Sequence, residues 1–427
     1  MASVGTLLHQ SHTKAAISPL SAETQTVNFQ GFLNLCGILL FVTHFRLIIE
    51  NLLKYGVLLR PPNPLLVLYD YRNWPCLSMV FVLQVFVLFA YFLEKRGKWL
   101  SSGMITALHI GNVGFVLVLP LFLSYKTTGD IISGGILLLI TSITALKLVS
   151  FAHVATQVRH AKLSKDWKAL PSKLQDTVTK YPASLPLRTF LYFLWAPTLC
   201  FQFEYPRSPK VRLGWLLRRI GELAVSLSLM IVLIQQYVFP LVLSTLPLLA
   251  DPETSYWQLL ERHLRIAIPS LYVWLLMFYA LFHCWLNILA EIMCFADREF
   301  YLDWWNSLTF GEFWRLWNRP VHQWVTRHLY HPLRSYGLSV PAAGVIVFFV
   351  SAIGHEYVVS GALKIVSYWA FLAMMAQVPL VMVMELLKGA LAGTQVGNVV
   401  FWVCFCMVGE PIAVLIYAQN VLNVVRS

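Results

Sequence analysis

The sequence has little charge. Asp, Glu, Lys and Arg make up 12% of its 427 residues, whereas soluble proteins carry about 25%. Hydrophobic residues make up 58%, and the mean hydropathy is +0.65. So few charges cannot form a polar surface around one soluble core, and the long apolar runs must therefore face lipid. This excludes a cytosolic enzyme, a secreted disulfide scaffold and a nucleic-acid-binding module.

Acidic residues are the scarcer charged class, with 20 Asp and Glu against 32 Lys and Arg, which gives a net charge of +12. In a soluble protein this excess of basic residues would suggest a nucleic-acid partner. In a membrane protein it is expected instead, because cytosolic loops collect Lys and Arg. Such loops can also attract anionic headgroups or an anionic cofactor.

The sequence also lacks the marks of a secreted protein. Its seven cysteines form no Cys-x-x-Cys pair and lie in or beside apolar runs. This pattern favours small buried hydrophobic residues over disulfides or metal ligands. The N-terminal region has no basic start followed by an apolar segment and a cleavage site, so no signal peptide is expected. We expect a short polar cytosolic segment over 1–27 and a membrane domain over 28–427, whose first spanning helix provides the targeting.

Long apolar runs are the main feature that is present. A spanning helix needs about 20 mostly apolar residues. The runs are continuous, which indicates helices rather than the short alternating strands of a barrel. We therefore expect an all-α polytopic membrane protein with nine transmembrane helices, at roughly 31–53, 76–94, 103–124, 131–154, 221–248, 264–294, 341–363, 367–387 and 397–419.

Lys and Arg indicate which connections are cytosolic. They end the second run, at Lys95 and Arg96, and they are frequent in the loops at about 155–220 and 297–338. We therefore expect a cytosolic N-terminus and a C-terminus on the opposite, lumenal face. One further apolar stretch, 187–203, is flanked by basic residues and interrupted by prolines. We interpret it as a re-entrant or interfacial segment that carries no span.

Ionisable side chains inside spans are costly, so they are functional candidates by default. Most have simple explanations: Arg46 and Glu50, for example, are four residues apart and can pair on one helix face. His355 is harder to explain, because it lies well inside a run and beside Glu356. Such a histidine can be a satisfied core group, or it can act as a general acid or base because its pKa lies near neutrality. Its position within the bilayer favours the second interpretation.

Aromatic residues crowd the stretch 300–330, FYLDWWNSLTFGEFWRLWNRPVHQWVTRHLY. An amphipathic belt at the membrane interface would explain its tryptophans. It would not explain Asp303, Asn306 and Asn318 among them, because polar groups enclosed by aromatic rings need partners. The histidines of the stretch match no strong zinc spacing, so no metal site is expected.

Two motifs resemble those of a known family. FYLDWWN at 300–306 and GHEYVVS at 354–360 are similar to motifs of the membrane-bound O-acyltransferases, in the branch that holds sterol and diacylglycerol acyltransferases. The similarity extends from about residue 28 to residue 417. Within the branch, APTLCFQFEYPRSPKVR, WNRPVHQW and GEPIAVLIY resemble the type-1 diacylglycerol acyltransferases. Pro320 separates the chain from the sterol enzymes.

The resemblance implies both a fold and a site. The implied fold is a bundle of nine transmembrane helices around a membrane-buried reaction chamber, in a homodimer of the endoplasmic reticulum membrane. His355 matches the catalytic histidine, Asn318 a second catalytic-site residue, and Glu356 the acidic residue beside the histidine. The positions expected near acyl-CoA or the acceptor are Trp317, His322, Ser351, Gln377 and Glu410. The motif positions are Phe300, Tyr301, Asp303, Trp304, Trp305 and Asn306.

The implied reaction moves an acyl group from acyl-CoA, a co-substrate and no permanently bound cofactor, to the hydroxyl of diacylglycerol. His355 would accept the hydroxyl proton as the ester forms, and such general-base help contributes about 10²–10⁴-fold. A covalent acyl-enzyme is not expected, because no Ser or Cys is recognisably paired with the base. The same chemistry would serve a sterol, a fatty alcohol or monoacylglycerol. The alternative from another class is a transporter or channel that uses His355, Glu356 and Glu410 as a proton or ion relay.

Three features depart from the family pattern. Glu410 stands in GEPIAV where glutamine is expected. A carboxylate there could change contacts in the chamber, or stay protonated because it is buried. The polar region before the first run is short, and the end of the chain lacks the aromatic and acidic run of related proteins.

Overall fold

The computed structural model describes residues 30–59, 69–164, 168, 172–391 and 394–426. The chain divides into two units, residues 1–58 and 59–427. Helix α2 (Gln30–Tyr55) belongs to the first unit. All the other described helices lie in the second unit.

The described residues contain eight helical segments that are long and apolar enough to cross a membrane. This confirms the all-α polytopic fold. Each of the eight overlaps one of the nine expected spans, and the remaining one, 31–53, coincides with α2, half of whose side chains lie outside the described residues. The eight segments are Tyr71–Arg96, Ser102–Lys126, Ile131–Ser164, Leu213–Leu249, Tyr256–Ile292, Val340–Leu363, Trp369–Leu391 and Val396–Asn420.

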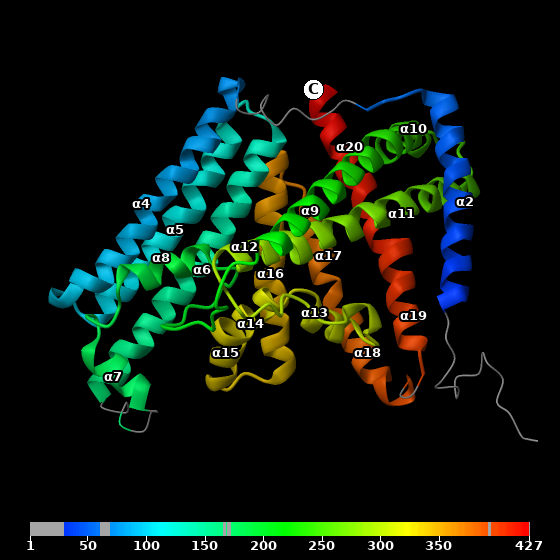
Figure 1. The fold of residues 1–427 in the computed structure, drawn as a ribbon. Helices are drawn as coiled ribbons and strands as arrows, with labels where there is room; N and C mark the ends of the chain where they lie inside the picture. The colour runs from blue at the N-terminus through cyan, green and yellow to red at the C-terminus, as the bar shows by residue number, and fades with distance from the viewer. Residues whose placement is uncertain (1–29, 60–68, 165–167, 169–171, 392–393, 427) are drawn as a thin grey trace, which may run out of the picture. The chain divides into compact units, whose positions relative to one another are not determined.

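Three helices near the start of the second unit form its tightly packed part: α4 (Trp74–Arg96), α5 (Ser102–Lys126) and α6 (Ile131–Ser164). They pack on one another side by side (Figure 1), and α16 (Val340–Leu363) packs against α6 and α5. Local sequence sets where they begin, because Ser101 and Ser339 cap α5 and α16 by accepting backbone N–H bonds. Gly361 lies at the close contact of α16 with α6, where a Cβ would press on the end of the Leu138 side chain.

Two short helices follow α6: α7 (Ser172–Lys180) and α8 (Leu187–Trp195). With nine residues, α8 is about 14 Å long and too short to cross a bilayer. This confirms that the stretch 187–203 holds no spanning helix. Its placement at the membrane interface stays a prediction.

The next two spans are longer than a bilayer requires. Each consists of 37 residues, about 55 Å of helix, against a hydrocarbon thickness of about 30 Å. Figure 1 shows α9 and α11 oblique to α16, which is how a long helix can fit such a layer. A π-helical stretch interrupts each span. Their parts are α9 (Leu213–Leu233), η4 (Ile234–Val238) and α10 (Phe239–Ala250), then α11 (Tyr256–Phe278), η5 (Tyr279–Trp285) and α12 (Leu286–Ile292).

The expected loop at 297–338 consists largely of short helices, and three more spans follow it. The loop holds η6 (Trp304–Asn306), α13 (Phe310–Trp317), α14 (Arg319–Val325), η7 (Thr326–Tyr330) and α15 (His331–Ser335). After α16 come α17 (Trp369–Met375), α18 (Gln377–Leu391), α19 (Val396–Val403), η8 (Cys404–Gly409) and α20 (Glu410–Arg426).

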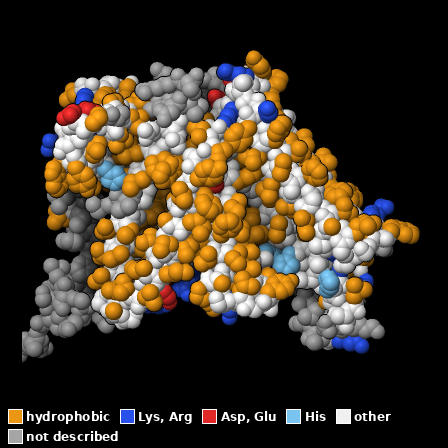
Figure 2. Space-filling view, turned by 180° about the vertical axis from the view of Figure 1, so that it is seen from behind, with side chains coloured by type: hydrophobic (Ala, Val, Ile, Leu, Met, Phe, Trp, Pro, Cys, Tyr) orange, Lys and Arg blue, Asp and Glu red, His pale blue; other side chains and the backbone are white. Residues whose placement is uncertain are grey.

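The described surface is largely apolar. Hydrophobic side chains cover most of the face seen in Figure 2, and Lys and Arg gather toward its margins. Large side chains such as Phe81, Phe115 and Leu386 are well exposed on the spanning helices. A water-soluble protein would not leave so many exposed, so these faces are suited to lipid.

Candidate functional site

The catalytic candidate His355 lies on α16 with an exposed side chain. Its Nδ1 is 2.8 Å from the carbonyl oxygen of Ser351 and 3.5 Å from the Ser351 hydroxyl. A carbonyl oxygen only accepts hydrogen bonds, so Nδ1 is the nitrogen that holds the proton in the neutral ring. The lone pair is therefore on Nε2, which is the state that a general base requires. Ser351, expected near the substrate, thus sets the tautomer of His355.

Glu356 points to a different part of the structure from the His355 ring. Its Oε1 accepts a hydrogen bond from the backbone N–H of Tyr368 at 2.9 Å, and its Oε2 one from Phe371 at 3.1 Å. The Ser360 hydroxyl also donates to this carboxylate. Among the described residues, no hydrogen bond joins Glu356 to His355. The carboxylate therefore anchors the start of α17 to α16.

Asn318 joins α13 to α14 and is half-buried. Its Oδ1 accepts from the backbone N–H of Val321 at 3.2 Å and caps α14. The following residue, Arg319, donates its N–H to the carbonyl of Phe300, so the cap is fastened to the FYLDWWN segment. The side-chain amide of Asn318 has no hydrogen-bond partner in the described part of the chain. It remains able to donate to a substrate.

Trp317 belongs to a cluster of aromatic rings in the second unit. Its ring stacks on Trp274 at 4.6 Å and 11°, and meets Trp304 edge to face at 5.0 Å. Trp304 is 3% exposed. These two tryptophans of the stretch 300–330 therefore form a core rather than an interfacial belt. The cluster reaches α16 through Trp314, whose ring lies 6.3 Å from that of Phe348.

The polar residues of FYLDWWN have partners close by. Asn306 donates from Nδ2 to Asp303 Oδ2 at 3.3 Å. Trp305 is 46% exposed, but its carbonyl accepts from Asn398 at 2.9 Å and so fastens the motif to α19. Phe300 is buried. The motif thus connects α13 to α19.

The three remaining candidates lie on three different helices. His322 is half-buried on α14, and burial together with the nearby Arg319 and Arg315 lowers its pKa, so the ring is neutral near pH 7. Gln377 is half-buried at the first position of α18, and its amide donates to the Ala373 carbonyl at 3.4 Å. Glu410 begins α20, but its side chain lies outside the described residues.

A second histidine site, which the sequence analysis did not identify, supports the motif. His283, in the π-helical η5, has Nε2 2.5 Å from Arg219 Nη1 and Nδ1 2.7 Å from the Tyr301 hydroxyl. Arginine only donates, so Nε2 accepts, and Nδ1–H must donate to Tyr301. The Tyr301 proton is then free to be donated elsewhere. His283 lies inside an expected span, as His355 does, and this was the signal that could have found it.

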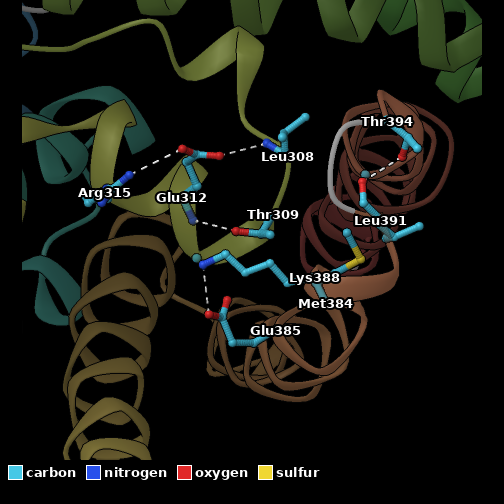
Figure 3. A pocket seen from close by; sticks show the side chains of 11 residues that line it. Leu308, Thr309, Glu312, Arg315, Met384, Glu385, Lys388, Leu391 and Thr394 are labelled. Atoms are coloured by element: carbon cyan, nitrogen blue, oxygen red, sulfur yellow. Dashed lines mark hydrogen bonds and ion pairs between the residues drawn. The ribbon is translucent and has the colours of Figure 1, made fainter.

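A cavity of about 520 Å³ opens between α13 and the end of α18 (Figure 3). Its charges balance: Arg315 pairs with Glu312 at 3.3 Å, and Lys388 pairs with Glu385 at 3.1 Å. Met384 on its wall belongs to the aromatic cluster around Trp317, so the cavity adjoins that cluster. The volume suits a small molecule. His355 does not line this cavity.

Comparisons with known proteins agree with this architecture. Residues 97–419 match the family model described as MBOAT, membrane-bound O-acyltransferase family. Diacylglycerol O-acyltransferase 1C of Glycine max is 38% identical over 96% of this chain and 79% of its own length. Diacylglycerol O-acyltransferase 1-2 of Oryza sativa subsp. japonica is 40% identical over 96% and 86%, and diacylglycerol O-acyltransferase 1 of Bos taurus is 38% identical over 95% and 84%. The chain belongs to the membrane-bound O-acyltransferase family.

Proposed function

We propose that the protein is an acyl-CoA:diacylglycerol O-acyltransferase, which makes triacylglycerol. The observation that carries this function is the 38–40% sequence identity to diacylglycerol O-acyltransferases over nearly the whole chain. It covers both FYLDWWN and the His355 segment. The geometry of His355 supports it, because Nδ1 faces the Ser351 carbonyl and leaves Nε2 free to receive a proton.

The proposed reaction is a direct transfer. The diacylglycerol oxygen attacks the thioester carbon while its proton moves to His355 Nε2. The C–S bond then breaks, and the coenzyme A thiolate takes the proton from the imidazolium, so that the base is restored. The amide of Asn318, which has no partner among the described residues, is suited to donate a hydrogen bond to the oxyanion, a contact worth about 10²–10³-fold in turnover.

The substrates fit a site open to lipid. Diacylglycerol and the acyl chain are apolar and can enter sideways, because faces of α16 to α20 are exposed rather than covered by protein. Coenzyme A carries phosphates and would approach the basic loops at 155–220 and 297–338. We also propose an endoplasmic reticulum location, a cytosolic N-terminus, a homodimer and no permanently bound cofactor.

An acceptor panel with purified protein tests this function. Labelled oleoyl-CoA is supplied with diacylglycerol, monoacylglycerol, a sterol or a fatty alcohol, and the labelled esters are separated. We expect triacylglycerol as the main product and oleoyl-CoA consumption that depends on the acceptor. Preferential labelling of another alcohol would assign that acceptor instead. Transport in vesicles with no acyl-CoA consumed would place the protein in another functional class.

A further inference from the structure

A second groove of about 520 Å³ lies beside α8 and is not lined by any of the residues assigned to acyl transfer. Its wall is mainly apolar, and two arginines stand in it without an acidic residue. The lining residues are Leu187, Arg188, Leu191, Tyr192, Trp195, Arg207 and Met293. We call this surface the α8 groove.

The two arginines are unusual because neither Arg188 nor Arg207 forms an ion pair within the described residues. Nearby arginines do: Arg212 pairs with Glu291 at 2.8 Å, and Arg218 with Glu222 at 3.0 Å. The Arg207 guanidinium lies 3.7 Å from the centre of the Tyr192 ring. Because Tyr192 is buried, this cation–π contact holds the guanidinium at the groove while its edges stay free to donate.

The outer face of α8 is apolar although the helix is too short to span a membrane. Leu187, Leu191 and Trp195 are four residues apart and are 39%, 40% and 68% exposed. The opposite face is packed, since Phe190 and Phe193 are fully buried. A short helix with an exposed apolar stripe is suited to the membrane interface, where tryptophan lies at headgroup level. The stripe and the two cations therefore meet at that level.

We propose that the α8 groove binds an anionic glycerophospholipid of the surrounding leaflet, with its phosphate on Arg188 and Arg207 and an acyl chain along the stripe. Guanidinium groups match phosphate geometry, and each can donate two parallel hydrogen bonds. The apolar wall distinguishes this occupant from free phosphate, which has nothing to place on Leu191 and Trp195. A zwitterionic lipid fits less well, because the lining has no carboxylate for its ammonium group.

The α8 groove is packed against the FYLDWWN segment, so a lipid bound in the groove would affect that segment. Tyr192 and Met293, from the groove, belong to the same hydrophobic cluster as Phe300 and Tyr301. The backbone of Arg207 also forms a β-bridge with Phe295, just before the motif. The bound lipid thus stabilises the connection between α8 and the motif.

Titration of phosphatidylglycerol into the purified full-length protein in detergent tests this site. Bound lipid is counted by native mass spectrometry, and the thermal midpoint is followed in parallel. An arginine near a lipid phosphate contributes about fivefold in affinity, so Arg188→Gln with Arg207→Gln should weaken tight binding by more than about fivefold. Lys210→Gln is the matched control, because it removes one charge from the same loop outside the groove.

The conservative double variant Arg188→Lys with Arg207→Lys controls for misfolding. It should keep most of the phosphatidylglycerol binding and most of the increase in thermal midpoint that the lipid causes. Phosphatidylcholine should bind tightly neither to the wild type nor to the double lysine variant. An equal loss in Lys210→Gln, or no loss in the double glutamine variant, would overturn the proposal. So would displacement of the lipid by inorganic phosphate or by oleoyl-CoA at similar concentrations, since the groove would then serve a soluble anion or the co-substrate.

Discussion

The α4–α6 region and the α16–α20 region have similar hydropathy but differ in packing. In the most apolar stretch of α6, 44% of the residues are buried inside the protein, against 11% in α16. Their mean hydropathies are 2.0 and 1.7. Similar composition therefore serves two purposes: one region forms a packed scaffold, and the other leaves faces open to lipid. His355 lies in the open region.

The two regions also treat charge differently. In the packed region Glu94 is 4% exposed and is held by His109 at 2.8 Å, by Tyr181 at 2.6 Å and by Arg159. All its partners are side chains of neighbouring elements, so the network joins α4, α5, α6 and the loop before α8. In the open region His355 bonds only within its own helix, among the described residues. Substitution of Glu94 should therefore cost stability, whereas substitution of His355 should cost activity.

The largest effect is expected at His355. His355→Ala removes the proposed base, so acyl transfer should fall by about 10²–10⁴-fold. The thermal midpoint should stay near that of the wild type, because the ring is exposed and bonds only to Ser351. Turnover with labelled oleoyl-CoA and diacylglycerol measures the loss. His160→Ala, an exposed histidine at the end of α6, is the control. A variant that kept wild-type turnover would end the assignment.

Glu94→Gln tests the packed region. The change leaves Arg159 without its buried counter-ion, and breaking a buried pair of this kind costs about 3–5 kcal/mol. We expect a large drop in the thermal midpoint in detergent, with turnover per folded molecule little changed. Glu385→Gln is the matched control, because its pair with Lys388 is exposed and should matter little. Equal midpoints for the two variants would contradict the contrast between the regions.

Asn318 combines both roles, and two substitutions separate them. Asn318→Asp keeps an oxygen that can cap α14 but removes the amide donor. If that donor contacts the oxyanion, turnover should fall by about 10²–10³-fold at an unchanged midpoint. Asn318→Ala removes the cap as well and should lower stability by a further 1 kcal/mol or so. Full activity in the Asp variant would leave only the structural role.

Glu356→Gln should lower the stability of the protein more than its catalytic turnover. Both carboxylate oxygens accept backbone N–H groups at the start of α17, and a glutamine can satisfy only one of them. One unpaired N–H costs about 1–3 kcal/mol. We expect a lower thermal midpoint and faster proteolysis at 364–368. Lost turnover at a wild-type midpoint would place the carboxylate in the reaction instead.

The amino-acid sequence predicted the features that depend on composition and on motifs, namely the spanning helices and the family. Eight of the nine expected spans coincide with described helices that are long and apolar enough to cross a membrane, and FYLDWWN with GHEYVVS identified the family. It also separated the 187–203 stretch from the spans, because charge and proline are visible in the sequence.

The partners of each polar group could not be read from the sequence. His283 reaches Tyr301 across 18 positions, and His109 reaches Glu94 across two helices, so only packing brings them together. Glu356 caps α17 because α16 ends in a left-handed turn at Lys364, which reverses the chain toward the carboxylate. Hydropathy treats α6 and α16 alike, so it also could not show which of them is open.

The smallest effect concerns pH at the junction of α6 and η7. His328 Nδ1 lies 2.9 Å from Nδ1 of His153 and its Nε2 lies 2.7 Å from the Ser150 hydroxyl. Two facing nitrogens can share one proton, but a second proton would place two donors against each other beside Arg327. Burial, with His153 and Arg327, lowers the pKa of His328 from 6.5 to about 3.

The unfolded state therefore binds more protons than the folded state between pH 6.5 and pH 3, and stability falls as pH decreases through that window. From about pH 7.5 to about pH 6.0 the loss should be about 1 kcal/mol. Thermal midpoints of the wild type and of His328→Gln at both pH values measure it. Glutamine cannot be protonated there, so the variant should lose less stability on acidification. An identical decrease in both proteins would assign the pH dependence to other groups.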